Sequence, residues 1–355
     1  MSPNVPFRNA WFLPLCWVCF PIALVLFVAA FLPILRSAQP AHVVVYTALD
    51  EDFSRPVFEA FTRQTGIVVR GKFDTESTKS VGLTQAILAE QTRPRCDVFW
   101  NNEIVNTLRL RRAGLLASYP ASAAEPFPPQ YRASDQTWFG FAARARVIIV
   151  NTDLVSANAR PSSIKDLTDA EWQGRVGIAK PLAGTTASHA ACLFAAWGPE
   201  DAKEFFRAVK ANARVLAGNK QVARAVATGE LAFGLTDTDD AMIELEAGRP
   251  VEIVYPDQAD DQIGTLFIPN TVAIITGAPH REAAERLINF MLLPEVERML
   301  AAGPSAQIPL NPAVEQPLRV KSPQTIRPMQ VDFEAAAQQW DSAAKFLREV
   351  FAKAG

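Results

Sequence analysis

Short runs of β-branched and apolar residues alternate with amphipathic helical runs along most of the chain, and no other feature limits the fold as much. The run His42–Tyr46 predicts a strand buried on both faces. In the helical run after it, Ser54 is a candidate N-cap and Gly66 is placed to end the helix. This first series comprises strands at 42–46, 67–70 and 97–100 and helices at about 54–65 and 81–91. Such alternation predicts parallel strands with a ligand crevice at their carboxyl ends.

A loop rich in Pro and Ala at 121–129 separates this series from a second one. Its expected strands are 147–150, 176–179, 232–235 and 251–254, and its helices are 185–197, 202–211 and 222–228. Strands at 264–268 and 271–275 then return to the first series and lead into helices at 281–292 and 295–300. A chain of 355 residues is too long for one compact core. We therefore predict an α/β protein of two lobes, whose hinge is formed by strands near 140–150 and 264–275.

The expected domains follow from this pattern. Residues 1–41 form an N-terminal membrane anchor or signal peptide, 42–141 plus 264–300 form lobe 1, and 142–263 plus 301–355 form lobe 2.

The N-terminus contains no charged residue from Trp11 to Leu35, and Arg8 and Arg36 flank this segment. A signal-peptide core spans about 7–15 apolar residues and a membrane helix about 20. The length favours an uncleaved anchor through residues 11–35, and a long removable signal peptide is the alternative. Either way we expect export, to the periplasmic or extracellular face of the cytoplasmic membrane.

Charge and cysteine content exclude some classes of protein. The net charge of -2 gives no electrostatic reason to expect nucleic acid as a partner. Outside the N-terminal segment only Cys96 and Cys192 remain. We interpret both as buried thiols, and a bridge between them is the alternative.

Several sequence blocks resemble, in order, the ferric-ion-binding family of periplasmic solute-binding proteins. The blocks are VVVYTALDEDFSRPVFEAFTRQTGI, CDVFWNNE, GFAARARVIIVNTDLV, LTDAEWQGRVGIAKP, GELAFGL and GTLFIPNTVAIITGAPHREAAERLINFML. The resemblance implies the bacterial transferrin type of the periplasmic-binding-protein fold, with a central ligand cleft between two α/β lobes. It also implies a monomer that delivers its ligand to an ABC permease and its ATPase.

The same resemblance shows a departure at the ligand positions. Iron-binding members commonly have a His after the first strand, an acidic residue after the DVF strand and a Tyr-Tyr pair later, where this chain has Asp50, Asn102 and Asp239-Asp240. The usual Tyr-Tyr iron ligands are thus lacking. Carboxylate oxygens still suit hard cations, and Glu103 lies beside Asn102. Asp50, Asp239 and Asp240 are our candidate metal ligands, for Fe³⁺ with a phosphate or carbonate anion.

Carboxylates gather where a strand ends and a helix begins, in the run Thr236–Asp240. Helix capping explains one or two of these acids. Three acids within four residues (Asp237, Asp239 and Asp240) favour a ligand site. Asp50 is a weaker candidate, because an acid there also caps the following helix.

Groups suited to an anion form the complementary set. The resemblance places Arg144 in the cleft, where relatives use it against a bound anion. Gly184, Thr185 and Thr186 begin a helix, whose N–H groups and hydroxyls can hold an anion or be those of an ordinary capped helix. Thr75 is added by the same logic, whereas Arg146 is expected in a surface ion pair.

Tyr46 and Thr47, which end the first strand, and Trp100, which ends the DVF strand, are candidates for the cleft wall, and core packing is the alternative for the aromatic rings. His189 stands alone on its helix and is not expected to bind metal.

The predicted function is the extracytoplasmic solute-binding component of an ABC importer. Its ligand is either ferric iron with a synergistic anion or a solute bearing phosphate or phosphonate, such as an aminophosphonate. No nucleophile elbow, Walker loop or dinucleotide fingerprint indicates an enzyme. The alternatives are a phosphohydrolase that holds Mg²⁺ through Asp237, Asp239 and Asp240, and a membrane-tethered sensor.

Overall fold

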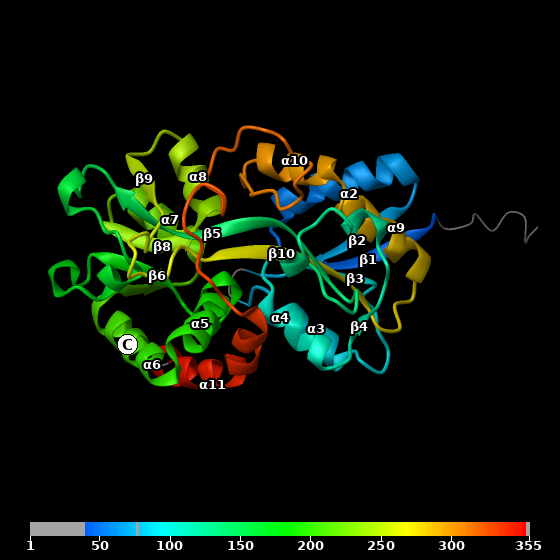
Figure 1. Cartoon of the computed structure of the whole chain (residues 1–355), viewed down its shortest axis with the longest axis horizontal. Coiled ribbons are helices and arrows are strands. Elements are labelled where there is room, and N and C mark those ends of the chain that lie inside the picture. Colours follow the sequence, from blue (N-terminus) through cyan, green and yellow to red (C-terminus); the bar gives the residue numbers. More distant parts are fainter. Residues whose placement is uncertain (1–39, 76–77, 353–355) are drawn as a thin grey trace, which may run out of the picture. The chain divides into compact units, whose positions relative to one another are not determined.

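Two antiparallel strands, β5 (Phe139–Asn151) and β10 (Phe267–Ile275), run through the middle of the sheet and join its two halves (Figure 1). The computed structural model describes residues 40–75 and 78–352. Every residue of β5 is buried, and its two ends pair with different strands: Phe139–Ala145 with β10 and Arg146–Asn151 with strands of the second half. The predicted two-lobed α/β fold with crossing strands is confirmed.

The first half of the sheet has the order β2-β1-β3-β10, with β4 also on β10. β1 is parallel to β2 and β3, whereas β10 is antiparallel to β3. Its strands and helices are β1 (His42–Thr47), α2 (Glu51–Thr65), β2 (Val68–Phe73), α3 (Val81–Ala89), β3 (Val98–Asn101), α4 (Val105–Arg112), β4 (Leu116–Ala117), α9 (Arg281–Met291) and α10 (Pro294–Ala302).

The second half continues from β5 in the order β8-β6-β7, and β9 also pairs with β5. β6 is parallel to β7 and β8, so the carboxyl ends of these three strands lie at one edge. Its strands and helices are β6 (Val176–Ala179), α5 (Gly184–Trp197), α6 (Pro199–Asn212), β7 (Arg214–Leu216), α7 (Asn219–Ala227), β8 (Phe233–Asp237), α8 (Thr238–Glu246) and β9 (Val251–Val254).

Helix α2 illustrates how local sequence sets these elements. It ends as predicted at Gly66, whose φ of 71° lies in the left-handed region that glycine adopts without a steric penalty. Its start is Glu51 and not Ser54. Ser54 is not the cap, because it is buried in the first turn and its hydroxyl donates to the carbonyl O of Asp50 (3.0 Å).

Strand β10 replaces the two separate strands that we expected at 264–268 and 271–275. It is continuous from Phe267 to Ile275, and its register against β5 shifts between Pro269 and Asn270. Proline has no N–H to donate to the ladder. The Asn270 side chain donates instead to the carbonyl O of Ala142 on β5, which maintains the connection between the two strands.

A C-terminal helix that we did not predict, α11 (Phe333–Phe351), packs against both halves. It lies against α5 and α6 of the second half and reaches α4 of the first (Figure 1, red). On α4, Arg109 stacks 4.9 Å from the ring centre of Trp340, and Arg111 Nη1 pairs with Glu334 Oε1 (2.5 Å). Asp332 caps the helix by accepting from the N–H of Ala335 (3.0 Å).

Cys96 and Cys192 are both buried and free, which confirms the buried thiols and excludes a bridge between them. Within residues 40–75 and 78–352 no helix combines the length and the apolar character that a membrane crossing needs. The predicted anchor at 11–35 lies outside the described residues and stays a prediction, as do the exact boundaries of the two lobes.

Candidate functional site

A cavity of about 530 Å³ lies where the carboxyl ends of β8, β6 and β7 face the loops after β1 and β3. Its lining contains most of the predicted ligand residues. Those that line it are Asp50, Asn102, Arg144, Gly184, Thr185, Thr186, Asp237, Asp239 and Asp240. Parallel strands bring their carboxyl ends together, which is why residues far apart in the sequence meet here. Whether each contacts a ligand stays a prediction.

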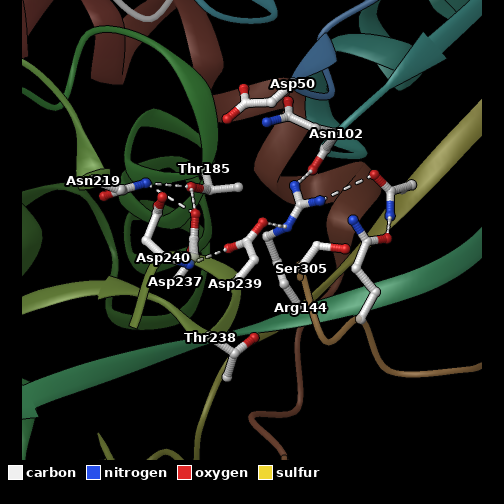
Figure 2. A network of polar contacts seen from close by, with 12 residues as sticks. Asp50, Asn102, Arg144, Thr185, Asn219, Asp237, Thr238, Asp239, Asp240 and Ser305 are labelled. Carbon is white, nitrogen blue, oxygen red and sulfur yellow. Dashed lines mark hydrogen bonds and ion pairs between the residues drawn. The ribbon is translucent and has the colours of Figure 1, made fainter. Parts of the chain in front are cut away.

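Arg144 connects the two walls of the cavity. It comes from β5, and Figure 2 shows its guanidinium between Asp239 and the backbone of Asn102. Nε lies 3.1 Å from Asp239 Oδ2, and Nη1 donates to the carbonyl O of Asn102 (2.6 Å). Nη2 donates to Asn270 Oδ1 (3.2 Å). Arg144 is therefore held rigidly by groups of the protein, and little of its charge is left for a ligand.

Arg146 corrects our expectation of a surface ion pair, because its side chain is fully buried. It donates to Asp237 Oδ1 (2.7 Å), and Asp237 Oδ2 accepts from Thr185 (2.5 Å) and from Asn219 Nδ2 (2.9 Å). Figure 2 shows the Asn219, Thr185 and Asp237 part of this network. A buried carboxylate needs such partners, since desolvation of a lone charge is costly. Asp237 is thus fully engaged in holding β5, β8, α5 and α7 together.

Four aspartates, Asp50, Asp237, Asp239 and Asp240, line the part of the cavity beside β8 and the loop after β1, which we call the inner end. Asp239 and Asp240 occupy the first turn of α8, and Asp50 pairs with Lys79 (Nζ to Oδ1, 2.5 Å). Burial raises the pKa of Asp239 to about 6, against the opposing effect of Arg144. Carboxylate oxygens of Asp237, Asp239 and Asp240 lie within 4.8 Å of one another. The described residues thus offer oxygen ligands, with a buried Arg on two of the three acids.

Two helix N-termini face the cavity from the second half. Neither α5, which starts at Gly184, nor α7, which starts at Asn219, has a side chain that caps its first turn. The first N–H groups of a helix have no partner within the helix, and the helix dipole adds positive potential there. The N–H of Gly184 donates to the carbonyl O of Lys79 (2.8 Å). The following amides are placed to donate to an anion.

Asn102 supplies an acceptor without a partner. The side chain is almost completely buried, it lines the cavity, and its Oδ1 accepts no hydrogen bond from the described residues. An orphaned buried acceptor costs free energy. This oxygen is itself shielded from the cavity, so a donor group of a ligand reaches it only when the side chain turns.

Five predicted residues lie outside the cavity lining. The Tyr46 side chain is buried, and its hydroxyl donates a hydrogen bond to Glu90 Oε2 (2.9 Å). Burial together with Glu90 raises the pKa of Tyr46. Thr47 is fully buried and accepts from the N–H of Leu49 (3.2 Å). Thr75 is exposed and bonds Thr78 (2.7 Å). Trp100 is likewise a core residue, packed between Phe58 and Phe141.

Glu103, the fifth, connects the two halves. Its carboxylate is fully buried, and Oε2 accepts from the Ser188 hydroxyl of α5 (2.6 Å). The backbone hydrogen bond from the Gly184 N–H to the carbonyl O of Lys79 is a second contact of this kind. Together the two contacts join the loops of the first half to α5. We did not predict Lys79 or Asn219 in the lining. The Gly218-Asn219 pair at the start of a helical run was the available signal for Asn219.

The chain's four tyrosines, Tyr46, Tyr119, Tyr131 and Tyr255, all lie within the described residues, and none lines the cavity. The oxygen atoms that line this cavity therefore come from carboxylates, hydroxyls, amides and the backbone.

His189 lies on α5 and is almost completely buried. Burial, with the nearby charge of Arg146, lowers its pKa well below its usual 6.5. The unfolded chain takes up this proton as the pH falls below about 6.5 and the folded chain does not, so stability is lost on acidification. We expect the free energy of unfolding to fall more between about pH 6.5 and 5 in the wild type than in His189→Gln. Urea denaturation measures it; identical pH profiles would contradict the neutral histidine.

Comparison with known proteins gives consistent findings. Residues 42–303 match the family model described as bacterial extracellular solute-binding protein. The major ferric iron-binding protein of Neisseria meningitidis serogroup A is 26% identical over 286 residues, 79% of this chain and 85% of that protein. A putative 2-aminoethylphosphonate-binding periplasmic protein of Salmonella typhi is 25% identical, over 70% of this chain and 71% of its own. The structure of iron-bound HitA from Pseudomonas aeruginosa superposes with a TM-score of 0.80 at 24% identity, covering 88% of this chain and 99% of that one.

Proposed function

Because this chain belongs to the family of bacterial extracellular solute-binding proteins, we propose that its cleft captures a small solute carrying both a phosphate or phosphonate group and a hydrogen-bond donor such as an amine. We assign the chain as the solute-binding component of an ABC importer, which its membership of this family supports. In that role it delivers its ligand to a membrane permease. We place the protein at the periplasmic face of the cytoplasmic membrane, as a monomer.

The observation that carries this proposal is the division of the cavity into donors and acceptors. The α5 and α7 N-termini present amide donors on one wall. The carboxylates of Asp240 and Asp50 present acceptors at the inner end. A ligand that satisfies both sets has an anionic group and, close to it, a positively charged or donating group.

Ferric iron with phosphate or carbonate is the second candidate, favoured by the clustered oxygens of Asp237, Asp239 and Asp240. The residues fit this cargo less well. Asp237 is bound by Arg146 and Asp239 by Arg144, so a trivalent cation would lie beside two buried guanidinium groups. Like charges at short range in a buried site are strongly unfavourable.

A thermal-shift panel with the purified full-length protein separates these candidates. The probes are 2-aminoethylphosphonate, a sugar phosphate, inorganic phosphate, and a ferric salt with carbonate. A ligand at a hundredfold excess over its Kd stabilises the folded state by about 2.7 kcal/mol. We expect the largest rise in Tm with 2-aminoethylphosphonate or the sugar phosphate. A rise only with ferric carbonate would transfer the assignment to iron, and no rise with any phosphorus compound would refute the proposal.

The same protein tests the proposal that the chain is not an enzyme. We expect no hydrolysis of a phosphate ester, because Asp237, the carboxylate that accepts from the Thr185 hydroxyl, is already bound by Arg146 and Asn219. Turnover that disappears in Asp239→Ala would establish the phosphohydrolase instead.

A further inference from the structure

The cavity continues beyond the acidic end, along the carboxyl ends of neighbouring strands. β8, β6 and β7 are adjacent in the sheet, and the lining includes residues at the end of each: Asp237, Ala179 and Leu216. Neighbouring strands lie about 4.8 Å apart, so the line from β8 to β7 spans about 10 Å. A hydrated ion or a single phosphate group occupies only part of this length.

Two lysines line the part of the cavity beside β6 and β7, which we call the outer end. They differ from the other cations of the site in having no carboxylate partner within the described part of the chain. Arg144, Arg146 and Lys79 each pair with an aspartate. Lys180, just after β6, and Lys210, on α6, are half-buried, and neither has a carboxylate within ion-pair distance among residues 40–75 and 78–352. Taking an ammonium partly out of water without a counter-ion is unfavourable, which a ligand anion would offset.

An aromatic ring completes the outer end. Phe351, the last residue of α11, lines the cavity and lies 5.9 Å (ring centre) from Lys210 Nζ. Val215 and Leu216 add apolar surface beside it. A carbon skeleton therefore has apolar walls to contact between the helix N-termini and the lysines.

We propose that Lys180, Lys210 and Phe351 form a second subsite, which holds a second anionic group at the far end of an elongated organic ligand. The inference rests on the proposed function and narrows it to solutes with two separated acidic groups. The first anionic group takes the amides of α5 and α7, the carbon skeleton lies along β6 and β7, and the second anionic group lies between the lysines.

Two sets of probes test the subsite by calorimetry on the full-length protein: alkane-α,ω-bisphosphonates of two to eight carbons, and the n-alkylphosphonates of the same lengths. In the wild type we expect the best bisphosphonate to bind about tenfold or more tightly than the matching monophosphonate, since one added ion pair with a half-buried lysine is involved. In Lys180→Gln/Lys210→Gln we expect this ratio to fall to about one.

Lys203→Gln is the matched control, because Lys203 is also on α6 but pairs with Glu200 away from the cavity. It should keep the wild-type ratio. A ratio near one in the wild type, or an unchanged ratio in the double variant, would overturn the subsite and leave the proposed function standing. If neither probe set binds, the subsite fails, and the thermal-shift panel with 2-aminoethylphosphonate and the sugar phosphate decides the proposed function separately.

Discussion

Replacing Arg146 with methionine is expected to lower the free energy of unfolding by about 3–5 kcal/mol, because it leaves a buried carboxylate without its charge partner. Arg146 is fully buried, and its 2.7 Å bond to Asp237 joins β5 to β8. Thr185 and Asn219, which bond the same carboxylate, cannot neutralise it. Urea denaturation followed by circular dichroism measures the loss.

Two further variants make this result specific. Arg214→Met removes an exposed ion pair with Glu230 and should cost less than about 1 kcal/mol. Arg146→Met/Asp237→Leu removes both charges and should recover much of the lost stability. If Arg146→Met were no more harmful than Arg214→Met, the network would not hold the second half of the sheet together as described.

Replacing Asp240 with asparagine is expected to weaken binding of the cognate solute by about 30-fold, equivalent to about 2 kcal/mol for truncating one partner of a charged contact. Asp240 lines the inner end of the cavity in the first turn of α8 and is half-buried. Asparagine keeps the shape and removes the charge. Calorimetry with the compound that gives the largest thermal shift measures the change.

The matched control for this variant is Asp201→Asn. Asp201 also occupies the first turn of a helix, α6, but it is exposed and does not line the cavity. Both variants lose the same favourable interaction with a helix dipole, so their stabilities should fall by similar small amounts. Equal affinities in Asp240→Asn and the wild type would remove the inner end of the cavity from the binding model.

The sequence predicted the fold and the position of the site for a physical reason. Runs such as His42–Tyr46 and Val176–Ala179 are local signals. Within each half, βαβ order brings the carboxyl ends of the parallel strands to one edge, and the two edges face each other across the cavity. That geometry places Asp50, Asn102 and Asp239 near one another without any knowledge of side-chain contacts.

The partners of individual charges were not predictable in the same way. Arg146 lies 91 residues from Asp237, and nothing local distinguishes it from a surface arginine. Glu103 was itself a predicted site residue. Its carboxylate accepts from Ser188, and the residue does not line the cavity.

Helix α11 was also missing from the sequence-based prediction, although the sequence contains a clear helical pattern for it. Phe333, Ala336, Trp340, Ala343 and Leu347 recur at three- and four-residue spacing after the capping Asp332, which predicts an amphipathic helix. Lys210 was missed because its position depends on how α6 packs against α5 and α11. Lys180 directly follows β6, so the rule that strand ends form the site was an available signal for it.

The packing of α11 on both α4 and α5 affects how long a captured solute stays in place. When the halves rotate apart about β5 and β10, the helix must lose its contacts with one of them. It separates either from Arg109 and Arg111 on α4, or from the apolar surface of α5 and α6. Solute release therefore requires the contacts of α11 with one of the halves to separate, in addition to a bend in the two hinge strands. We therefore expect the residence time of the cargo to depend partly on α11, although this helix does not line the acidic end of the cavity.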